Sequence, residues 1–323
     1  MVTGQTMRVG ALTDPAKNLG AAIEHFLTYC QAKNLSGNTL IYYRQRLEAF
    51  RSFVESQGLD AETSAVSRTL IRNFVRSELD ANSPSTANHA ITALRAFFGF
   101  LMREGYLPEN PMVGVEKVKT KRPLIEAFTP EQIKAVLATC RNDFLGIRDR
   151  AVILTLFDAG LRVSELCNLH LDDVSLHEAR LKVLGKGNRE RVVAFGQATK
   201  QALAQYRARR GELDSKAFFV SQYGRPLDRF RIAKMIKSRC RKAGVTGVRC
   251  SPHTLRHTFA ISYLRNGGDL FSLQKLLGHS SLDMTRRYTE VSQTDALERH
   301  RLCSPADRLN LPERDKGRRR RLV

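Results

Sequence analysis

The first part of the chain repeats apolar residues with the spacing of an amphipathic helix. From Leu19 onward they recur three and four positions apart, in four successive stretches. Ser36 and Ser83 stand where a serine side chain caps a helix start, and Pro84 suits a first helical position. The pattern therefore predicts a small bundle of four helices over residues 19–107.

The helical pattern breaks after this bundle. Residues 108–123 contain three prolines and a basic cluster, which predicts an extended linker. Helical spacing resumes at Thr129, which opens a capping-box motif with Gln132. Further on, the pattern predicts helices over about 130–158 and 164–169, paired strands at Leu181–Leu184 and Arg191–Phe195, and helices again from about 199.

These elements predict a fold that is mainly α with a small antiparallel β-sheet. The hairpin turn is placed at Gly185-Lys186-Gly187-Asn188, because its glycines suit the positive φ angles of such turns. The predicted boundaries are a tail at 1–18, a helical domain at 19–107, a linker at 108–123, a mixed domain at 124–310 and a basic tail at 311–323.

The net charge of the chain indicates a candidate binding partner. The 323 residues include 53 Lys and Arg against 32 Asp and Glu, a net charge of +21. Residues 1–122 hold 15 basic and 11 acidic side chains (+4), whereas residues 123–323 hold 38 and 21 (+17). Such an excess repels itself in the folded state unless a polyanion compensates it. Nucleic acid is the expected partner, and a membrane is not, because no amphipathic Lys/Arg-rich helix stands out.

Composition excludes several other classes. No run of apolar residues approaches the 18 or so that a membrane span needs, and the start lacks a signal-peptide pattern. The six cysteines are scattered without a C-x-x-C pair, which argues against a zinc site or a disulfide framework. We therefore expect a cytoplasmic, nucleoid-associated protein of a bacterium or archaeon.

Three segments of the second half carry unusual side chains. Arg162 and Glu165 lie in a tight turn after Gly160, Lys186 lies in the hairpin turn, and the third segment holds the residues His253, Arg256, His257, His279 and Tyr288. Each has a plain structural interpretation when taken alone: a surface Arg–Glu pair, a solvated lysine, or core histidine and tyrosine side chains.

Together these side chains suit a reaction at a phosphodiester. Arginine forks bind phosphate oxygens, and a tyrosine hydroxyl can attack phosphorus if nearby cations favour its phenolate. A lysine or histidine can protonate the departing sugar oxygen. The sequence shows no carboxylate cluster of the kind that two-metal nucleases use for Mg²⁺.

The same segments resemble a known family. The stretches that carry the resemblance are AGLRVSEL, LGKGNRERVV, HTLRH, LLGHSSLDMT and RRY. In order, spacing and context they are similar to the tyrosine recombinases, the lambda-integrase family that includes the Xer-type enzymes. The resemblance covers residues from about 19 to 310. It implies a SAM-like helical core-binding domain and an α+β catalytic domain.

The resemblance also implies a role for each matching residue. Arg162 and Arg256 would clamp the scissile phosphate, and Tyr288 would attack it to give a 3′-phosphotyrosyl link. Lys186 would protonate the 5′-oxygen, His253 would assist proton transfer, His279 would bind a non-bridging oxygen, and Glu165 would orient its neighbours. His257 fits a structural histidine better, because it lies one position off the His253/Arg256 pair. No metal or other cofactor is expected.

The implied partner is double-stranded DNA with inverted-repeat core sites. A homotetramer on two duplexes would exchange strands through a Holliday junction, and the free protein would be a monomer or dimer. Ala296–Leu309 would dock on a neighbouring subunit and looks more like segments of mobile-element integrases. Side chains of the linker would contact the duplex; they are Lys117, Lys119, Lys121 and Arg122.

Two other functions remain open on the sequence. A type IB topoisomerase or a hairpin telomere resolvase would use the same chemistry, but a topoisomerase would act as a monomer without pairing two DNA sites. A catalytically idle DNA-binding regulator could use the same fold, although binding alone needs no tyrosine nucleophile.

Overall fold

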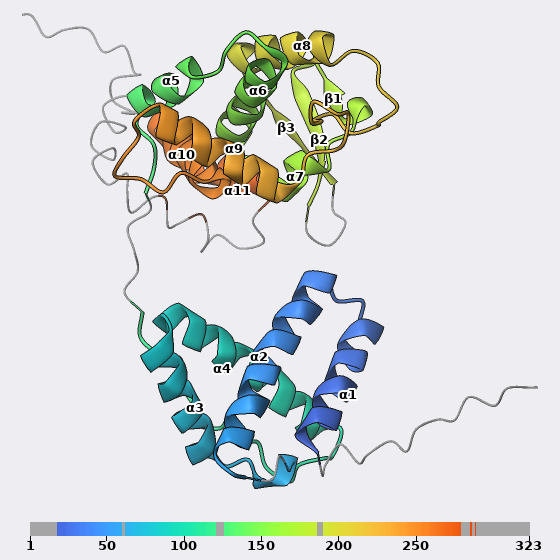
Figure 1. The fold of residues 1–323 in the computed structure, drawn as a ribbon, viewed down its shortest axis with the longest axis vertical. Coiled ribbons are helices and arrows are strands. Elements are labelled where there is room, and N and C mark those ends of the chain that lie inside the picture. The colour runs from blue at the N-terminus through green and yellow to red at the C-terminus, as the bar shows by residue number, and fades with distance from the viewer. Residues whose placement is uncertain are drawn as a thin grey trace, which may run out of the picture. The chain divides into compact units, whose positions relative to one another are not determined.

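The computed structural model divides the chain into two compact units, Met1–Pro123 and Leu124–Val323 (Figure 1). It describes residues 18–59, 62–120, 126–185 and 190–278, together with Thr285 and Tyr288. The predicted tail at 311–323 and the segment 296–309 lie outside these residues, as does the predicted tail at 1–18 except for Asn18, which caps the first helix. Among the described residues, no helix is both long and apolar enough to cross a lipid bilayer.

The first unit is helical, as predicted. Its elements are α1 (Leu19–Ala32), α2 (Gly37–Ser56), the 3₁₀ turn Thr63–Ala65, α3 (Arg68–Ala81) and α4 (Pro84–Arg103). The predicted caps at Ser36 and Ser83 are confirmed, since each hydroxyl accepts a hydrogen bond from the backbone N–H three residues on. Between the helices lies a core rich in phenylalanine, including Phe26, Phe50 and Phe98.

The segment predicted as an extended linker is packed over much of its length. Met112 and Val115 are buried in the core of the helical unit, and Arg95 donates a hydrogen bond to the carbonyl of Val115. Asn88 binds both the N–H and the carbonyl of Val118. Burial of Met112 and Val115 is more favourable than the exposure to solvent that an extended linker would give them. The helical unit therefore continues through Val118.

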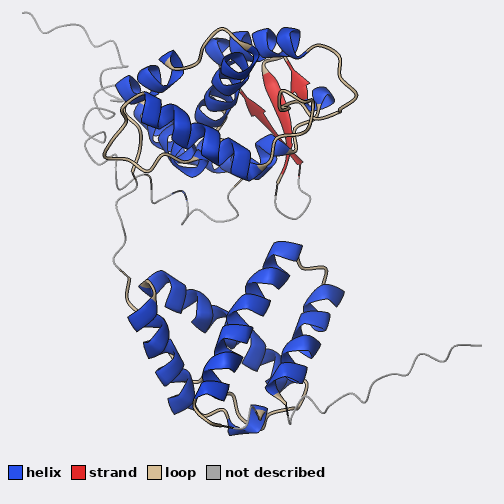
Figure 2. Ribbon diagram, viewed as in Figure 1, coloured by secondary structure: helices blue, strands red, loops and turns tan. Residues whose placement is uncertain are grey.

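The second unit combines helices with a small sheet (Figure 2). Its elements, in chain order, are α5 (Pro130–Ala138), α6 (Phe144–Asp158), α7 (Val163–Cys167), the 3₁₀ turn Leu171–Asp173, β1 (Val174–Ser175), β2 (Arg180–Leu184), β3 (Glu190–Ala194), α8 (Gln197–Arg210), α9 (Arg229–Lys242), α10 (Pro252–Arg265) and α11 (Leu270–Leu277). The strands form one antiparallel sheet in the order β1-β2-β3. Figure 1 shows α6 in the middle of this unit, next to α8 and α10.

Two predicted helical stretches are interrupted. The stretch 130–158 is two helices, because Asp143 caps a new helix at its start. Gly146 lies so close to the backbone of Arg141 that a Cβ there would overlap it. Residues 211–228 are not helical, and they form isolated bridges that pair His170 with Ala217 and Val220 with Pro226. The first pairing joins remote segments and the second closes a short irregular loop, and helical periodicity predicts neither.

The predicted hairpin is confirmed in its strands. Leu181 pairs with Val193 and Val183 with Arg191, and the alternating Leu181 and Val183 face the core while Leu184 is exposed. The predicted turn residues 186–189 lie outside the described residues, and Lys186 is among them.

Candidate active site

The turn between α6 and α7 places the first predicted site residue. Gly160 has a φ of +59° and touches Phe259 so closely that any Cβ would overlap that ring. Glycine is therefore required here for both its backbone angle and its lack of a side chain. Arg162 follows this turn as the N-cap residue of α7, and its backbone N–H donates to Glu165 Oε2 at 2.8 Å.

Glu165 lies at the centre of an arginine cluster. Its side chain is only 3% exposed and accepts hydrogen bonds from Arg162 Nη1 at 2.9 Å and from both Nη atoms of Arg191 at 2.7 and 2.9 Å. Arg256 Nη1 approaches Glu165 Oε2 to 3.9 Å. Burial opposes the ionisation of Glu165, but the hydrogen bonds from Arg191 and Arg162 outweigh it and hold its pKa below the ordinary value.

The same three arginines bind the end of α11. Arg191 Nε donates to the carbonyl of Leu276 at 2.9 Å, Arg256 Nη2 to that of Leu277 at 2.7 Å, and Arg162 Nη2 to that of Gly278 at 3.4 Å. These carbonyls belong to the last turn of the helix, where partial negative charge favours cations. The cluster thus fixes the chain up to the residue before His279, which itself lies outside the described residues.

Arg256 is the most deeply buried of the three guanidinium groups. It is 3% exposed and donates to the Gly160 carbonyl at 2.6 Å. Burial first, and then the neighbouring charge of Arg162, lowers the pKa of Arg256 to about 10. The guanidinium is still protonated at neutral pH, so the site keeps its positive charge.

Helix α10 also contacts Tyr288. The Nδ1 atom of His257 lies 2.6 Å from the hydroxyl oxygen of Tyr288, and the Tyr288 side chain is 4% exposed within a small core formed with α10 and α11. Arg256 is close enough to interact electrostatically with this tyrosine. His253, one turn earlier on α10, is exposed, and its ring centroid lies 4.3 Å from that of His257.

The structure thus brings together five residues that the sequence singled out and adds one that it did not. Arg162, Glu165, Arg256, His257 and Tyr288 form a connected cluster, and His253 borders it through His257. The added residue is Arg191. The sequence held a signal for Arg191, because Arg191 and Val193 lie two positions apart and so face the same, inward side of β3. A charged side chain on that side needs a buried partner.

The remaining predicted residues are not part of this cluster as described. Lys186 and His279 lie outside the described residues, as do Lys121 and Arg122. Lys117 and Lys119 are exposed on the first unit. Among the described residues, no three His, Cys, Asp or Glu side chains gather as a metal site would require.

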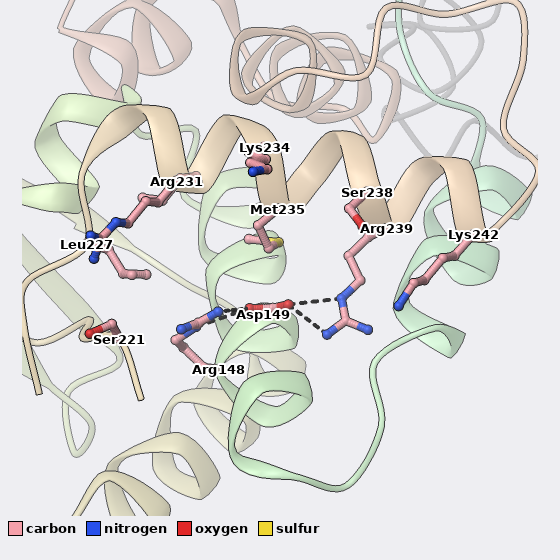
Figure 3. Close-up of a pocket in the computed structure, with 11 residues that line it drawn as sticks. Arg148, Asp149, Ser221, Leu227, Arg231, Lys234, Met235, Ser238, Arg239 and Lys242 are labelled. Carbon is pink, nitrogen blue, oxygen red and sulfur yellow. Dashed lines mark hydrogen bonds and ion pairs between the residues drawn. The ribbon is translucent and has the colours of Figure 1, made fainter. Parts of the chain in front are cut away.

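A hollow of about 380 Å³ lies beside α9 and shares no residue with the Glu165 cluster. Figure 3 shows Arg148 and Arg239 pointing at Asp149 on its floor. Asp149 accepts from Arg148 Nη2 at 2.7 Å and from Arg239 Nη2 at 2.7 Å, while the Nη1 atoms of both arginines donate to backbone carbonyls. These guanidinium groups are engaged with the protein itself, so the floor of the hollow is a structural ion-pair network.

Comparison with known proteins identifies the family. The phage integrase family matches residues 126–295, and the N-terminal SAM-like domain of phage integrases matches residues 23–105. The chain is 36% identical over 287 residues to tyrosine recombinase XerC of Thermodesulfovibrio yellowstonii, covering 85% of this chain and 93% of that protein. It is 37% identical over 281 residues to XerD of Staphylococcus saprophyticus, covering 84% and 94%.

Solved structures share the fold. The XerH site-specific recombinase bound to a palindromic difH substrate superposes with a TM-score of 0.74 at 19% identity, covering 93% of this chain and 99% of that one. A lambda integrase tetramer bound to a Holliday junction gives a TM-score of 0.68 at 19% identity, covering 86% and 83%. The chain belongs to the phage integrase family and is a tyrosine recombinase, a site-specific enzyme that cleaves and rejoins DNA.

Proposed function

We propose that Tyr288 is the nucleophile of this recombinase and forms a 3′-phosphotyrosyl intermediate with DNA. The observation that carries the proposal is the position of its hydroxyl, which lies 2.6 Å from a histidine and near the buried guanidinium of Arg256. A phenol with a reference pKa of about 10 needs such neighbours to react as a phenolate.

Arg162 and Arg256 are proposed to bind the scissile phosphate. The Arg162 side chain is 35% exposed, so part of it stays accessible although Glu165 holds it. Arg256 is rigidly held by two backbone carbonyls. A preorganised pair of guanidinium groups stabilises the extra charge of a pentacoordinate phosphorus without moving in the transition state.

The other roles follow from the resemblance and remain proposals. Lys186 would protonate the 5′-oxygen that leaves, His279 would bind a non-bridging oxygen, and His253 would assist proton transfer. Glu165 would hold Arg162 and Arg256 in register, which is supported by the hydrogen bonds and short approaches between them.

The proposed partner is double-stranded DNA with inverted-repeat core sites, bound by four copies across two duplexes in the cytoplasm. The net charge of +17 in residues 123–323 supports contacts with phosphates in the second unit. Lys117, Lys119, Lys121 and Arg122 would add contacts where the two units join. Docking of Ala296–Leu309 on a neighbour, and carriage by a mobile element, also remain proposals.

Tyr288→Phe tests the nucleophile. It removes one oxygen, so folding and DNA binding should persist while the covalent adduct on a nicked suicide substrate disappears from denaturing gels. Tyr263→Phe, on α10, is the matched control and should still form the adduct. An adduct formed by Tyr288→Phe would refute the assignment.

A two-site assay separates recombination from topoisomerase activity. The wild type should produce strands exchanged between two DNA molecules that carry the core site. Relaxation of supercoiled DNA without exchanged strands would instead indicate a topoisomerase, and specific binding without any adduct would indicate an idle regulator.

A further inference from the structure

His257 contacts the hydroxyl of Tyr288, which is the group proposed to attack phosphorus. Its Nδ1 lies 2.6 Å from the tyrosine hydroxyl, and the two ring centroids lie 5.5 Å apart at an interplanar angle of 54°. This distance is short for a hydrogen bond, and the tyrosine is 4% exposed. A buried hydroxyl at this distance has a directed partner rather than a chance neighbour.

We propose that His257 is the general base that accepts the proton of Tyr288 during cleavage and returns it during religation. This inference rests on the proposed function, because it assumes that Tyr288 is the nucleophile. It assigns a reacting role to a histidine that the sequence pattern marked as structural.

The proton and electron balance is simple. The Tyr288 O–H bond breaks, its proton binds Nδ1 of neutral His257, and the phenolate oxygen forms a bond to phosphorus. The bond from phosphorus to the 5′-oxygen breaks at the same centre, and that oxygen takes a proton from the acid proposed at Lys186. Religation reverses each transfer, so no oxidant, metal or nucleotide is consumed.

Other side chains around the pair suit this transfer. A histidine acts as a base through its neutral imidazole, whose ring nitrogen without a proton can accept one. Arg256 precedes His257 on α10, is buried, and interacts with Tyr288, so its charge favours the phenolate as it forms. A transfer that is coupled to attack on phosphorus needs no free phenolate beforehand.

The position of His253 distinguishes it from His257. His253 is exposed, and its ring lies against the ring of His257, at a centroid distance of 4.3 Å. In this arrangement His257 takes the proton from the tyrosine hydroxyl, 2.6 Å away, and the exposed His253 ring lies against the His257 ring.

The test uses the full-length protein and a nicked duplex whose core site has been selected by binding to this protein. His257→Asn places an amide oxygen near the position of Nδ1, so it keeps a hydrogen-bond acceptor but cannot take the proton. It should bind the duplex like the wild type and form the Tyr288 adduct about 10²- to 10⁴-fold more slowly, the range for loss of a general base. The control, His177→Asn, changes an exposed histidine in the second unit and should react like the wild type.

Chemical rescue distinguishes a His257 side chain that accepts a proton from one that only fills space. In His257→Ala, added imidazole should accelerate adduct formation in proportion to its neutral form, whereas pyrazole, a ring of similar size and far lower basicity, should not. Wild-type rates in His257→Asn, or equal rescue by both rings, would overturn the proposal.

One measurement needs neither DNA nor a variant at His257. The ¹⁵N resonance of His257 Nδ1 should shift between the wild type and Tyr288→Phe, because the phenol that contacts it is lost. An unchanged resonance would also overturn the proposal. A wild-type protein that binds its site but forms no adduct would instead refute the proposed function, and the role of His257 with it.

Discussion

At Glu165 a single carboxylate holds guanidinium groups from separate parts of the catalytic unit. Arg162 begins α7, Arg191 lies on β3, and both donate to it directly. Removing one partner of a buried ion pair leaves the other charges uncompensated, which costs far more than an exposed pair contributes. Glu165 therefore contributes both to the stability of the fold and to the positions of Arg162 and Arg256, the proposed phosphate ligands.

Glu165→Gln should lower the free energy of unfolding at pH 7 by about 3–5 kcal/mol, as measured by urea denaturation. The pKa of Glu165 is lowered in the folded state, so its ionised form stabilises the fold above its unfolded pKa of about 4.3. That contribution is lost as the pH falls through the lower folded pKa. The variant should therefore lose less stability than the wild type on acidification from about pH 6 to about pH 3.

A matched control is available on the sheet. Glu178 pairs with Arg180, but both side chains are about half exposed. Glu178→Gln should change the free energy of unfolding by less than about 1 kcal/mol. Equal stability of Glu165→Gln and wild type at pH 7 would contradict the importance of the arginine cluster.

At the residue scale, the sequence predicted which side chains gather in the cluster better than it predicted their contacts. Arg162, Glu165, Arg256 and Tyr288 were singled out by their types and motifs, and the structure brings them together. The contact between His257 and Tyr288 spans 31 positions, and that between Arg191 and Glu165 spans 26. Such pairings depend on how helices and strands pack, which local spacing does not encode.

Helix α10 is the element on which the site depends most. It carries Arg256 and His257 in successive positions, and the aromatic ring of Phe259 packs directly against Gly160. The carbonyl of Gly160 in turn accepts a hydrogen bond from Arg256. The close contact of α10 with the turn before α7 thus sets the distance between the two proposed phosphate ligands.

Gly160→Ala tests this contact. Its φ of +59° costs an alanine about 1–2 kcal/mol, and overlap with Phe259 adds about 1–3 kcal/mol of overpacking. Gly244 has a φ of +66° but open space around it, so Gly244→Ala should show the backbone cost alone. We expect thermal denaturation to show the larger loss of stability for Gly160→Ala, with adduct formation slowed only in that variant. A Gly160→Ala protein as stable and active as Gly244→Ala would show that the contact is not needed.

Elements whose ends are set locally were predicted well. The serine caps of α2 and α4 and the capping box at Thr129 each involve residues within one turn. The irregular segment 211–228 was missed because its pairing partner is remote: Ala217 pairs with His170. The break before α6 was missed although its signal is local, since Asp143 caps the new helix by accepting a hydrogen bond from the N–H of Gly146.

At the scale of the whole molecule, charge is distributed very unequally between the two units. Each unit has its own hydrophobic core, so each is expected to fold when produced alone. Residues 123–323 carry +17, against +4 for residues 1–122. The second unit should therefore supply most of the phosphate contacts, and the first should add affinity and site preference.

Salt dependence measures this division. For the full chain, the logarithm of the DNA association constant should fall linearly with the logarithm of salt concentration, by about 0.9 for each phosphate neutralised. A fragment that starts at Leu124 should keep most of that slope while binding more weakly and with less preference for the core site. A salt-independent affinity of the fragment, measured by fluorescence anisotropy, would place the phosphate contacts in the first unit instead.

The proposed function depends above all on a covalent bond between Tyr288 and DNA. The most direct measurement traps wild-type protein on a nicked suicide substrate, digests the adduct with nuclease and protease, and identifies by mass spectrometry the peptide that carries the nucleotide. The nucleotide should be attached through a 3′-phosphate to the peptide containing Tyr288, and each released DNA end should carry a 5′-hydroxyl. Attachment to another tyrosine or to a serine, or a free 3′-hydroxyl beside a 5′-linked peptide, would contradict the account.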